Sequence, residues 1–137
     1  HTAQEKAGSL FKIPSGMCTI ETLVPLMTDS VNKGLITEND IARILSEKPA
    51  ELFGLDHKKG FLRVGMDADI TLVDYDYGET IDINRFQSVS KVSAFNGFKL
   101  KGFPVATVLR GHIVMKDRKL IGEHQGEFVA AHPAKKE

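Results

Sequence analysis

The spacing of the apolar residues changes about halfway along the chain, and this change limits the folds that the chain can adopt. Over 18–33, apolar side chains recur every third or fourth residue, which is the period of a helix packed along one face. Over 69–74, a short apolar run is bounded by acidic residues instead, which is typical of a strand. The sequence therefore predicts a boundary near 54–60, with helices before it and a β module after it.

Cap residues and prolines divide the first half into helices. Thr37 precedes an acidic first turn, as the N-cap of a helix does, and Gly34 is placed to end the helix before it. Pro25 has no amide hydrogen, so the first helix is expected to begin in the turn before it or to bend there. Pro49 is expected to begin a further short helix. The predicted helices cover 18–33, 38–47 and 49–53.

The second half is predicted to form short strands joined by tight turns. Arg110-Gly111 separates two apolar runs by two residues, which is the spacing of a β-hairpin, and Asp117-Arg118 predicts a second turn. The end of the chain, 130–137, is small, polar and charged, and is expected to fray. The predicted strands cover 69–74, 105–110 and 112–116.

Composition and charge exclude several classes of protein. The 18 basic and 18 acidic side chains give a formal net charge of zero, which disfavours a nucleic-acid partner. No apolar run approaches the ~20 residues needed to cross a bilayer, so no membrane partner is expected either. Cys18 is the only cysteine, which excludes an intrachain disulfide and fits a reducing compartment such as the cytoplasm.

The residues alone do not indicate a complete active site. The five histidines are dispersed, without H-x-H or H-E-x-x-H spacing, and no catalytic signature surrounds Cys18. Asp67 and Asp69 lack the Gly and the terminal Glu of a calcium loop. A chain of 137 residues is one domain or part of a longer protein, and its opening residues contain no Met. We therefore expect the natural protein to be longer.

Three stretches carry motifs that occur together in one enzyme family. They are H-T-A-Q-E-K at 1–6, then I-P-S-G-M at 13–17 with I-E-T-L-V-P-L at 20–26, and K-P-A-E-L-F-G-L at 48–55 with K-G at 59–60 and V-G-M-D-A-D-I at 64–70. These stretches resemble, in order, D-H-A-P-H-T-x-x-E-K, P-x-G-x-x-x-x-E-x-x-x-P-L and N-P-A-x-x-F-G-L…K-G-x-I-x-x-G-x-D-A-D-L of the cyclic amidohydrolases. The resemblance covers nearly the whole chain and is closest to the dihydroorotase branch.

The resemblance implies an α/β fold. This chain would form the last part of a (β/α)8 metal-dependent hydrolase barrel, mostly helices, and the C-terminal strands of a small β-sandwich. The implied division is 1–54 for the barrel portion, 55–125 for the sandwich portion and 126–137 for a tail. The family's metal-binding histidines, carboxylated lysine and catalytic aspartate correspond to positions upstream of His1. No catalytic residue and no metal ligand is therefore expected in this chain.

The implied activity is that of a zinc-dependent enzyme that reversibly hydrolyses the ring amide of dihydroorotate to N-carbamoyl-aspartate, in pyrimidine biosynthesis. In the family, two zinc ions lower the pKa of a bridging water and an aspartate carries its proton. The alternatives are a hydantoinase, dihydropyrimidinase or allantoinase acting on another cyclic amide, or an inactive homologue that serves as a scaffold. Lys48 stands where Asn is usual, and Ser15-Gly16 lies between the dihydroorotase and hydantoinase patterns, so the substrate stays open. The full-length protein is expected to be a homo-oligomer, and this chain alone to be inactive.

The same resemblance assigns substrate-binding residues. His1 matches the histidine that contacts the substrate carboxylate in dihydroorotases, to which an imidazole can donate a charge-assisted hydrogen bond. The loop Pro14-Ser15-Gly16 matches the segment whose backbone faces the cyclic amide, where a glycine permits close approach. Asp67 and Asp69 match a structural turn that leads into a sandwich strand, and we do not expect them to be ligands.

Overall fold

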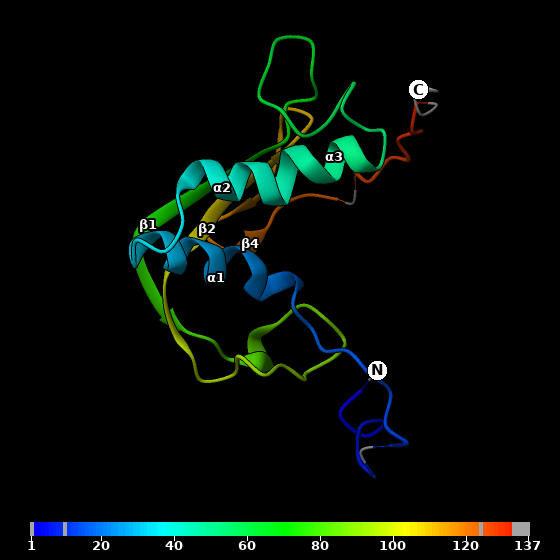
Figure 1. Ribbon diagram of the computed structural model, residues 1–137, viewed down its shortest axis with the longest axis vertical. Coiled ribbons are helices and arrows are strands. Elements are labelled where there is room, and N and C mark those ends of the chain that lie inside the picture. Colours follow the sequence, from blue (N-terminus) through cyan, green and yellow to red (C-terminus); the bar gives the residue numbers. More distant parts are fainter. Residues whose placement is uncertain (1, 10, 124, 133–137) are drawn as a thin grey trace.

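The computed structural model describes residues 2–9, 11–123 and 125–132. The elements are α1 (Ile20–Asn32), α2 (Glu38–Ala42), the π-helical turn η1 (Arg43–Glu47), α3 (Lys48–Leu52), β1 (Ile70–Thr80), the 3-10 turn η2 (Ile83–Arg85), β2 (Lys99–Leu109), β3 (His112–Lys116) and β4 (Lys119–Leu120). The described strands form one antiparallel sheet in the order β1-β2-β3-β4, and α1 packs against β2 (Figure 1). Within the described ranges, no helix has the length and apolar composition needed to span a membrane.

Helix α1 lies within the range that the apolar spacing predicts. It begins at Ile20 and continues through Pro25 to Asn32. Its end is a Schellman motif, in which the Gly34 N–H donates to the Val31 carbonyl at 2.8 Å and the next N–H donates to the carbonyl of residue 30 at 2.9 Å. The predicted role of Gly34 is therefore confirmed.

The next helical stretch is continuous from 38 to 52. Its start is as predicted, because Thr37 and Asp40 form a capping box in which each side chain accepts the backbone N–H of the other residue. The predicted helices at 38–47 and 49–53 are confirmed to within one residue, as α2 with η1 and as α3, but no break separates them. The chain widens into the π turn η1, where the Lys48 N–H donates to the Arg43 carbonyl five residues back. Pro49, which has no N–H, then lies at the beginning of α3, where none is needed.

The predicted hairpin of β2 and β3 is confirmed, with β3 over the predicted range, whereas β1 and β2 are longer than predicted. Arg110 and Gly111 form the turn with φ of +46° and +83°, as in a type I′ turn. The extensions of β1 to Thr80 and of β2 back to Lys99 contain acidic residues, glycines and a proline, which disfavour strands locally. Two shifts of register between β1 and β2, one of them opposite Pro104, accommodate these residues in the sheet.

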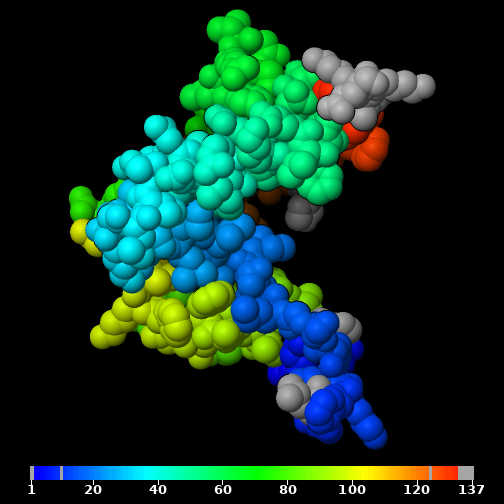
Figure 2. Space-filling model, viewed as in Figure 1, coloured from blue at the N-terminus to red at the C-terminus, as the bar shows by residue number. Residues whose placement is uncertain are grey.

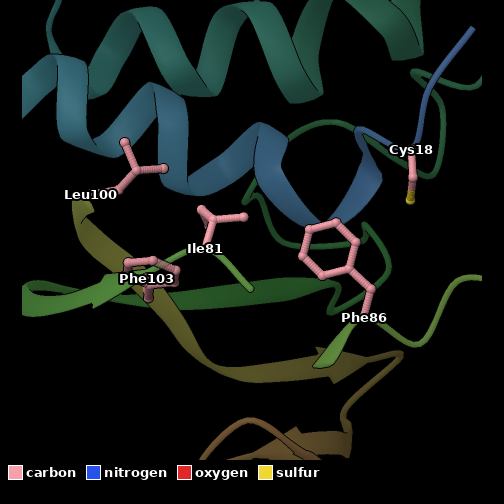
Figure 3. Close-up of a cluster of buried hydrophobic side chains, with 5 residues drawn as sticks. All are labelled: Cys18, Ile81, Phe86, Leu100 and Phe103. Carbon is pink, nitrogen blue, oxygen red and sulfur yellow. The ribbon is translucent and has the colours of Figure 1, made fainter. Parts of the chain in front are cut away.

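The apolar core lies between the start of α1, the segment that follows β1, and β2. Its buried side chains are Cys18, Ile81, Phe86, Leu100 and Phe103 (Figure 3). The core is small for a chain of this length, and large apolar side chains such as those of Phe11, Val64 and Phe128 stay exposed. The described part of the chain does not provide a further apolar surface against which these side chains could be buried.

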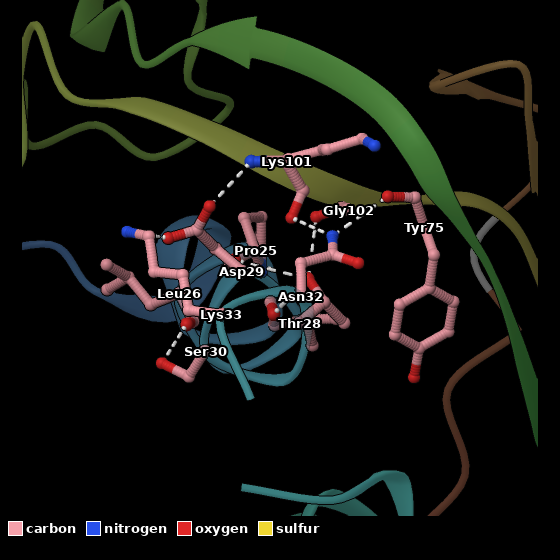
Figure 4. Close-up of polar contacts among 11 residues, drawn as sticks. Pro25, Leu26, Thr28, Asp29, Ser30, Asn32, Lys33, Tyr75, Lys101 and Gly102 are labelled. Atoms are coloured by element: carbon pink, nitrogen blue, oxygen red, sulfur yellow. Dashed lines mark hydrogen bonds and ion pairs between the residues drawn. The ribbon is translucent and has the colours of Figure 1, made fainter. Parts of the chain in front are cut away.

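Side chains near the end of α1 bind the backbone of the sheet (Figure 4). The Thr28 hydroxyl donates to the Gly102 carbonyl at 2.7 Å, and the Lys101 N–H donates to the Asp29 carboxylate at 3.0 Å. The Asn32 amide donates to a β1 carbonyl at 2.9 Å and to the Lys101 carbonyl at 3.0 Å, so it bridges the two strands where their register shifts. Polar bonds and apolar contacts therefore fix α1 on the sheet together.

The last described residues return to the end of α3. The His132 N–H donates to the Gly54 carbonyl at 2.9 Å, and His132 Nε2 lies 2.8 Å from Asp56 Oδ1. This hydrogen bond lowers the pKa of the Asp56 carboxyl. The expectation of a frayed end is therefore wrong for His132, because backbone and side-chain bonds both hold it. Residues 133–137 lie outside the described ranges.

Candidate substrate-binding site

A hollow of about 330 Å³ lies where the N-terminal segment meets the start of α1 and the loop 86–92. In Figure 2 the N-terminal segment projects beyond the body of the molecule, beside the yellow-green segment that contains this loop. Three stretches that are far apart in sequence form the hollow. Its lining residues with polar side chains are Lys6, Ser15, Thr19, Ser88 and Ser90.

Two of the four predicted substrate-binding residues, Ser15 and Gly16, line this hollow. Pro14 precedes them, and its carbonyl accepts a hydrogen bond from the Lys6 ammonium at 2.7 Å. His1 lies outside the described residues. The structure therefore brings the predicted loop and a cation to one place, while the roles of the four residues stay predictions.

Gly16 gives the floor of the hollow an open backbone. Its φ is +88°, in the left-handed region that favours glycine, and a Cβ placed on it would meet no described atom within 4 Å. Ser15 and Gly16 are both exposed. The main chain of this loop is therefore accessible to a ligand.

The loop 86–92 is joined to the segment that leads from Gly16 into α1. The N–H groups of Gln87 and Ser88 each donate to the Glu21 carboxylate at 3.0 Å. Further along the loop, the Val92 carbonyl accepts the Cys18 N–H at 3.0 Å. These bonds place the loop beside the predicted one and make it the second wall of the hollow.

The sequence does not predict Lys6, Ser88 and Ser90 as residues of this site. Lysine and serine are common on protein surfaces. Lys6 ends the first motif, which gives it no role in the site, and no motif includes Ser88 or Ser90. For the two serines the one available signal is Glu21, the acidic position of the second motif, but its hydrogen-bond partners lie 66 and 67 residues away. Local pattern does not reveal such a pairing.

Comparison with known proteins identifies the family. The sequence profile of the amidohydrolase family matches residues 9–114, which include Ser15, Gly16, the loop 86–92 and most of the sheet. The chain belongs to the amidohydrolase family. The resemblance inferred from the motifs is thereby confirmed.

The curated relatives of this amidohydrolase chain carry more than one specificity in their names. It is 38% identical over 122 residues to the L-hydantoinase of Paenarthrobacter aurescens, covering 88% of this chain and 27% of that protein. It is 43% identical over 114 residues to the dihydroorotase of Bacillus thuringiensis (strain Al Hakam), covering 82% of this chain and 26% of that protein. The chain thus spans about a quarter of the length of these relatives.

Solved structures support the same assignment. A D-hydantoinase (dihydropyrimidinase) from a Thermus species superimposes with a TM-score of 0.83 at 31% identity, covering 90% of this chain and 28% of that one. The amidohydrolase chain is accordingly an α/β fragment with an antiparallel sheet. The α/β part of the predicted fold class is thereby confirmed.

The described residues do not fit a zinc pair. They contain no group of three or more His, Cys, Asp or Glu side chains that could hold a metal ion. The sequence places His57 and His132 apart, but the structure brings their rings edge to face at 5.2 Å, with Asp56 as the neighbouring carboxylate. This contact lies at the end of α3 and does not include the hollow.

Asp67 and Asp69 are bound within the chain, as the structural interpretation of their motif predicts. The Lys59 ammonium lies 2.9 Å from the Asp67 carboxylate and 2.5 Å from that of Asp69. The Asp69 carboxylate also accepts the Arg110 N–H at 2.8 Å, which joins the entry of β1 to the hairpin turn. The Lys59 hydrogen bond lowers the pKa of the Asp67 carboxyl.

Proposed function

We propose that the full-length protein is a cyclic amidohydrolase that reversibly hydrolyses the ring amide of dihydroorotate, and that this chain supplies part of its substrate site. The observation that carries the proposal is the hollow itself, because the loop that the family motif assigns to the substrate lines it with an open backbone. The identity of 43% to a dihydroorotase supports the choice of substrate.

The residues of this chain would bind and orient the ring. Backbone groups of Ser15 and Gly16 can form hydrogen bonds with an amide N–H and carbonyl, which fix a planar ring in one orientation. Lys6 adds a positive charge near the same loop, and such a charge favours an anionic substituent on the ring. His1 would contact that carboxylate in the same proposal.

The chemical step would require residues outside this chain. We propose two zinc ions for the full-length protein, with their ligands and the catalytic aspartate upstream of His1, as the resemblance of the motifs implies. The proposal further includes the last part of a barrel over 1–54, a sandwich portion over 55–125 and a tail over 126–137. It also includes a cytoplasmic homo-oligomer without nucleic-acid or membrane partners.

A hydantoinase or dihydropyrimidinase is the second candidate. The observations in its favour are the 38% identity to an L-hydantoinase and the TM-score of 0.83 with a D-hydantoinase (dihydropyrimidinase). Hydantoin and dihydrouracil lack the ring carboxylate of dihydroorotate, and hydantoin has a five-membered ring, but a ring amide bond is cleaved in each case. The same site geometry therefore serves both candidates.

The deciding experiment is an assay of the full-length protein against dihydroorotate, hydantoin and dihydrouracil. We expect the highest kcat/KM for dihydroorotate, loss of activity with a zinc chelator and recovery on addition of zinc. A higher kcat/KM for hydantoin or dihydrouracil would favour the second candidate. No turnover of any of the three by the zinc-loaded protein would favour an inactive scaffold and contradict the proposal.

A further inference from the structure

We propose that Ser88 and Ser90 select the substituent on the substrate ring, and that Glu21 is the positioning residue that holds them in place. The inference rests on the proposed function, because it assigns a role to the second wall of the same site. It adds the loop 86–92, which no motif assigned to substrate, to the loop 14–16.

The loop 86–92 is fixed to α1 rather than free on the surface. Each oxygen of the Glu21 carboxylate accepts one backbone N–H, from Gln87 and from Ser88, at 3.0 Å. Hydrogen bonds to a charged acceptor are stronger than those between neutral groups. The Glu21 side chain therefore fixes the backbone N–H groups of two successive residues, Gln87 and Ser88.

Two further contacts anchor the loop at its ends. Phe86 is buried in the core beside Cys18, and the Cys18 N–H donates to the Val92 carbonyl at 3.0 Å. The Lys91 ammonium also donates to the Phe86 carbonyl, which closes the loop on itself. Ser88 and Ser90 lie between these anchors and are half-buried, whereas the side chain of Val89 between them is 86% exposed.

The short segment 16–21 contains one wall of the hollow, at Gly16, and the residue that holds the other wall, Glu21. Gly16 lies two residues before Cys18, and Glu21 is in the first turn of α1. A change at Glu21 therefore displaces the serine wall relative to Gly16 without removing any group that faces the hollow. This is the arrangement expected of a positioning residue.

The chemistry of the wall suits recognition of a ring substituent. A serine hydroxyl both donates and accepts hydrogen bonds, so Ser88 and Ser90 can bind a carboxylate or a carbonyl. A site built to form hydrogen bonds rejects analogues that lack the matching group. Dihydroorotate carries a carboxylate that hydantoin and dihydrouracil lack, and Lys6 lines the same hollow.

The test uses the full-length protein with Ser88→Ala, Ser90→Ala and Glu21→Gln. We expect each variant to raise KM for dihydroorotate about tenfold, with kcat within about twofold, and KM for hydantoin to change less. Ser30→Ala and Glu51→Gln are the matched controls, because the Ser30 hydroxyl donates within α1 and Glu51 pairs with Lys48 on α3. Both controls should keep the wild-type KM.

Hydrogen exchange separates positioning from direct contact. Glu21→Gln should speed exchange of the Gln87 and Ser88 amides about tenfold, whereas Ser90→Ala should leave both at the wild-type rate. An unchanged ratio of the two KM values in both serine variants would overturn the inference while the wild type still turns over dihydroorotate. Unchanged exchange in Glu21→Gln would overturn the role of Glu21. A wild type that neither binds nor hydrolyses any of the cyclic amides would overturn the proposed function and the inference with it.

Discussion

Gly102 lies in β2 directly against Thr28 of α1. Thr28 is 1% exposed, and a Cβ placed on Gly102 would lie 2.7 Å from both the Cβ and the Oγ1 of Thr28. Gly102 also has a φ of +102°, where residues with a side chain are strained. Glycine is therefore required at this position for two reasons, the positive φ and the lack of space for a Cβ beside Thr28.

We predict that Gly102→Ala destabilises the protein by about 3 kcal/mol, from backbone strain and overpacking together. Gly111→Ala is the matched control, because Gly111 has a φ of +83° but a Cβ there meets no described atom within 4 Å. The control should cost only about 1–2 kcal/mol of backbone strain. Urea denaturation of both variants measures the difference. Equal losses would show that the contact with Thr28 is unimportant.

At the scale of elements, a buried carboxylate joins α1 to the sheet. Asp29 is 7% exposed, and burial by itself raises the pKa of its carboxyl. The Lys33 ammonium, at 2.5 Å, and the Lys101 N–H outweigh this effect, so the pKa of Asp29 lies below its usual value. The charged form therefore holds α1 against β2.

The lowered pKa of Asp29 predicts a dependence of stability on pH. Because the folded chain binds this proton less tightly than the unfolded chain, the contribution of Asp29 is complete above pH ~4 and is lost as the pH falls further. Denaturation midpoints at pH 7 and pH 3 should therefore differ less in Asp29→Asn than in the wild type. Asp76→Asn is the control, since the Asp76 side chain is 94% exposed and a surface ion pair contributes little. The prediction would be contradicted if the midpoints at pH 7 and pH 3 differed as much in Asp29→Asn as in the wild type.

The stretch from 38 to 52 shows how one element absorbs a local conflict. Pro49 cannot donate to the helix, and the π turn before it lets the chain continue without a break. The capping box at Thr37 and Asp40 fixes the start of the same stretch. Both features follow from backbone hydrogen bonding, but only the cap is visible from the order of residue types.

At the scale of the whole molecule, the described chain has more apolar surface than its own core can cover. A second hollow, of about 1020 Å³, lies between α1 and the sheet and is lined partly by Val24, Pro25 and Leu120. The chain also spans about a quarter of the length of its relatives. Under the proposed function, the remainder of the protein covers these surfaces and supplies the metal ligands.

We predict that the isolated 137-residue chain neither hydrolyses dihydroorotate nor retains a zinc pair after dialysis. The reason is that the described residues contain no cluster of three possible ligands, and a site displaced by even ~1 Å loses much of its rate. Metal analysis of the purified chain, beside the full-length protein as control, tests this directly. Two tightly bound zinc ions per chain with measurable hydrolysis would contradict it.

Local sequence pattern was sufficient to predict the order of the helices and strands and to indicate the protein family. The apolar spacing predicts α1, the capping signals predict Thr37 and Gly34, and the turn at Arg110-Gly111 predicts the hairpin. These signals act within a few residues, where sequence and backbone conformation are directly linked. The motifs likewise indicate the family that the comparisons confirm.

Only the tertiary structure decided the features that depend on distant partners. The wall formed by Ser88 and Ser90 exists because Glu21 binds peptide groups 66 and 67 residues away. The full length of β1 and β2 depends on pairing across register shifts, and the position of His132 depends on Gly54 and Asp56. In each case the stabilising contact forms only when distant segments pack together, so the residue types within one local segment do not predict it.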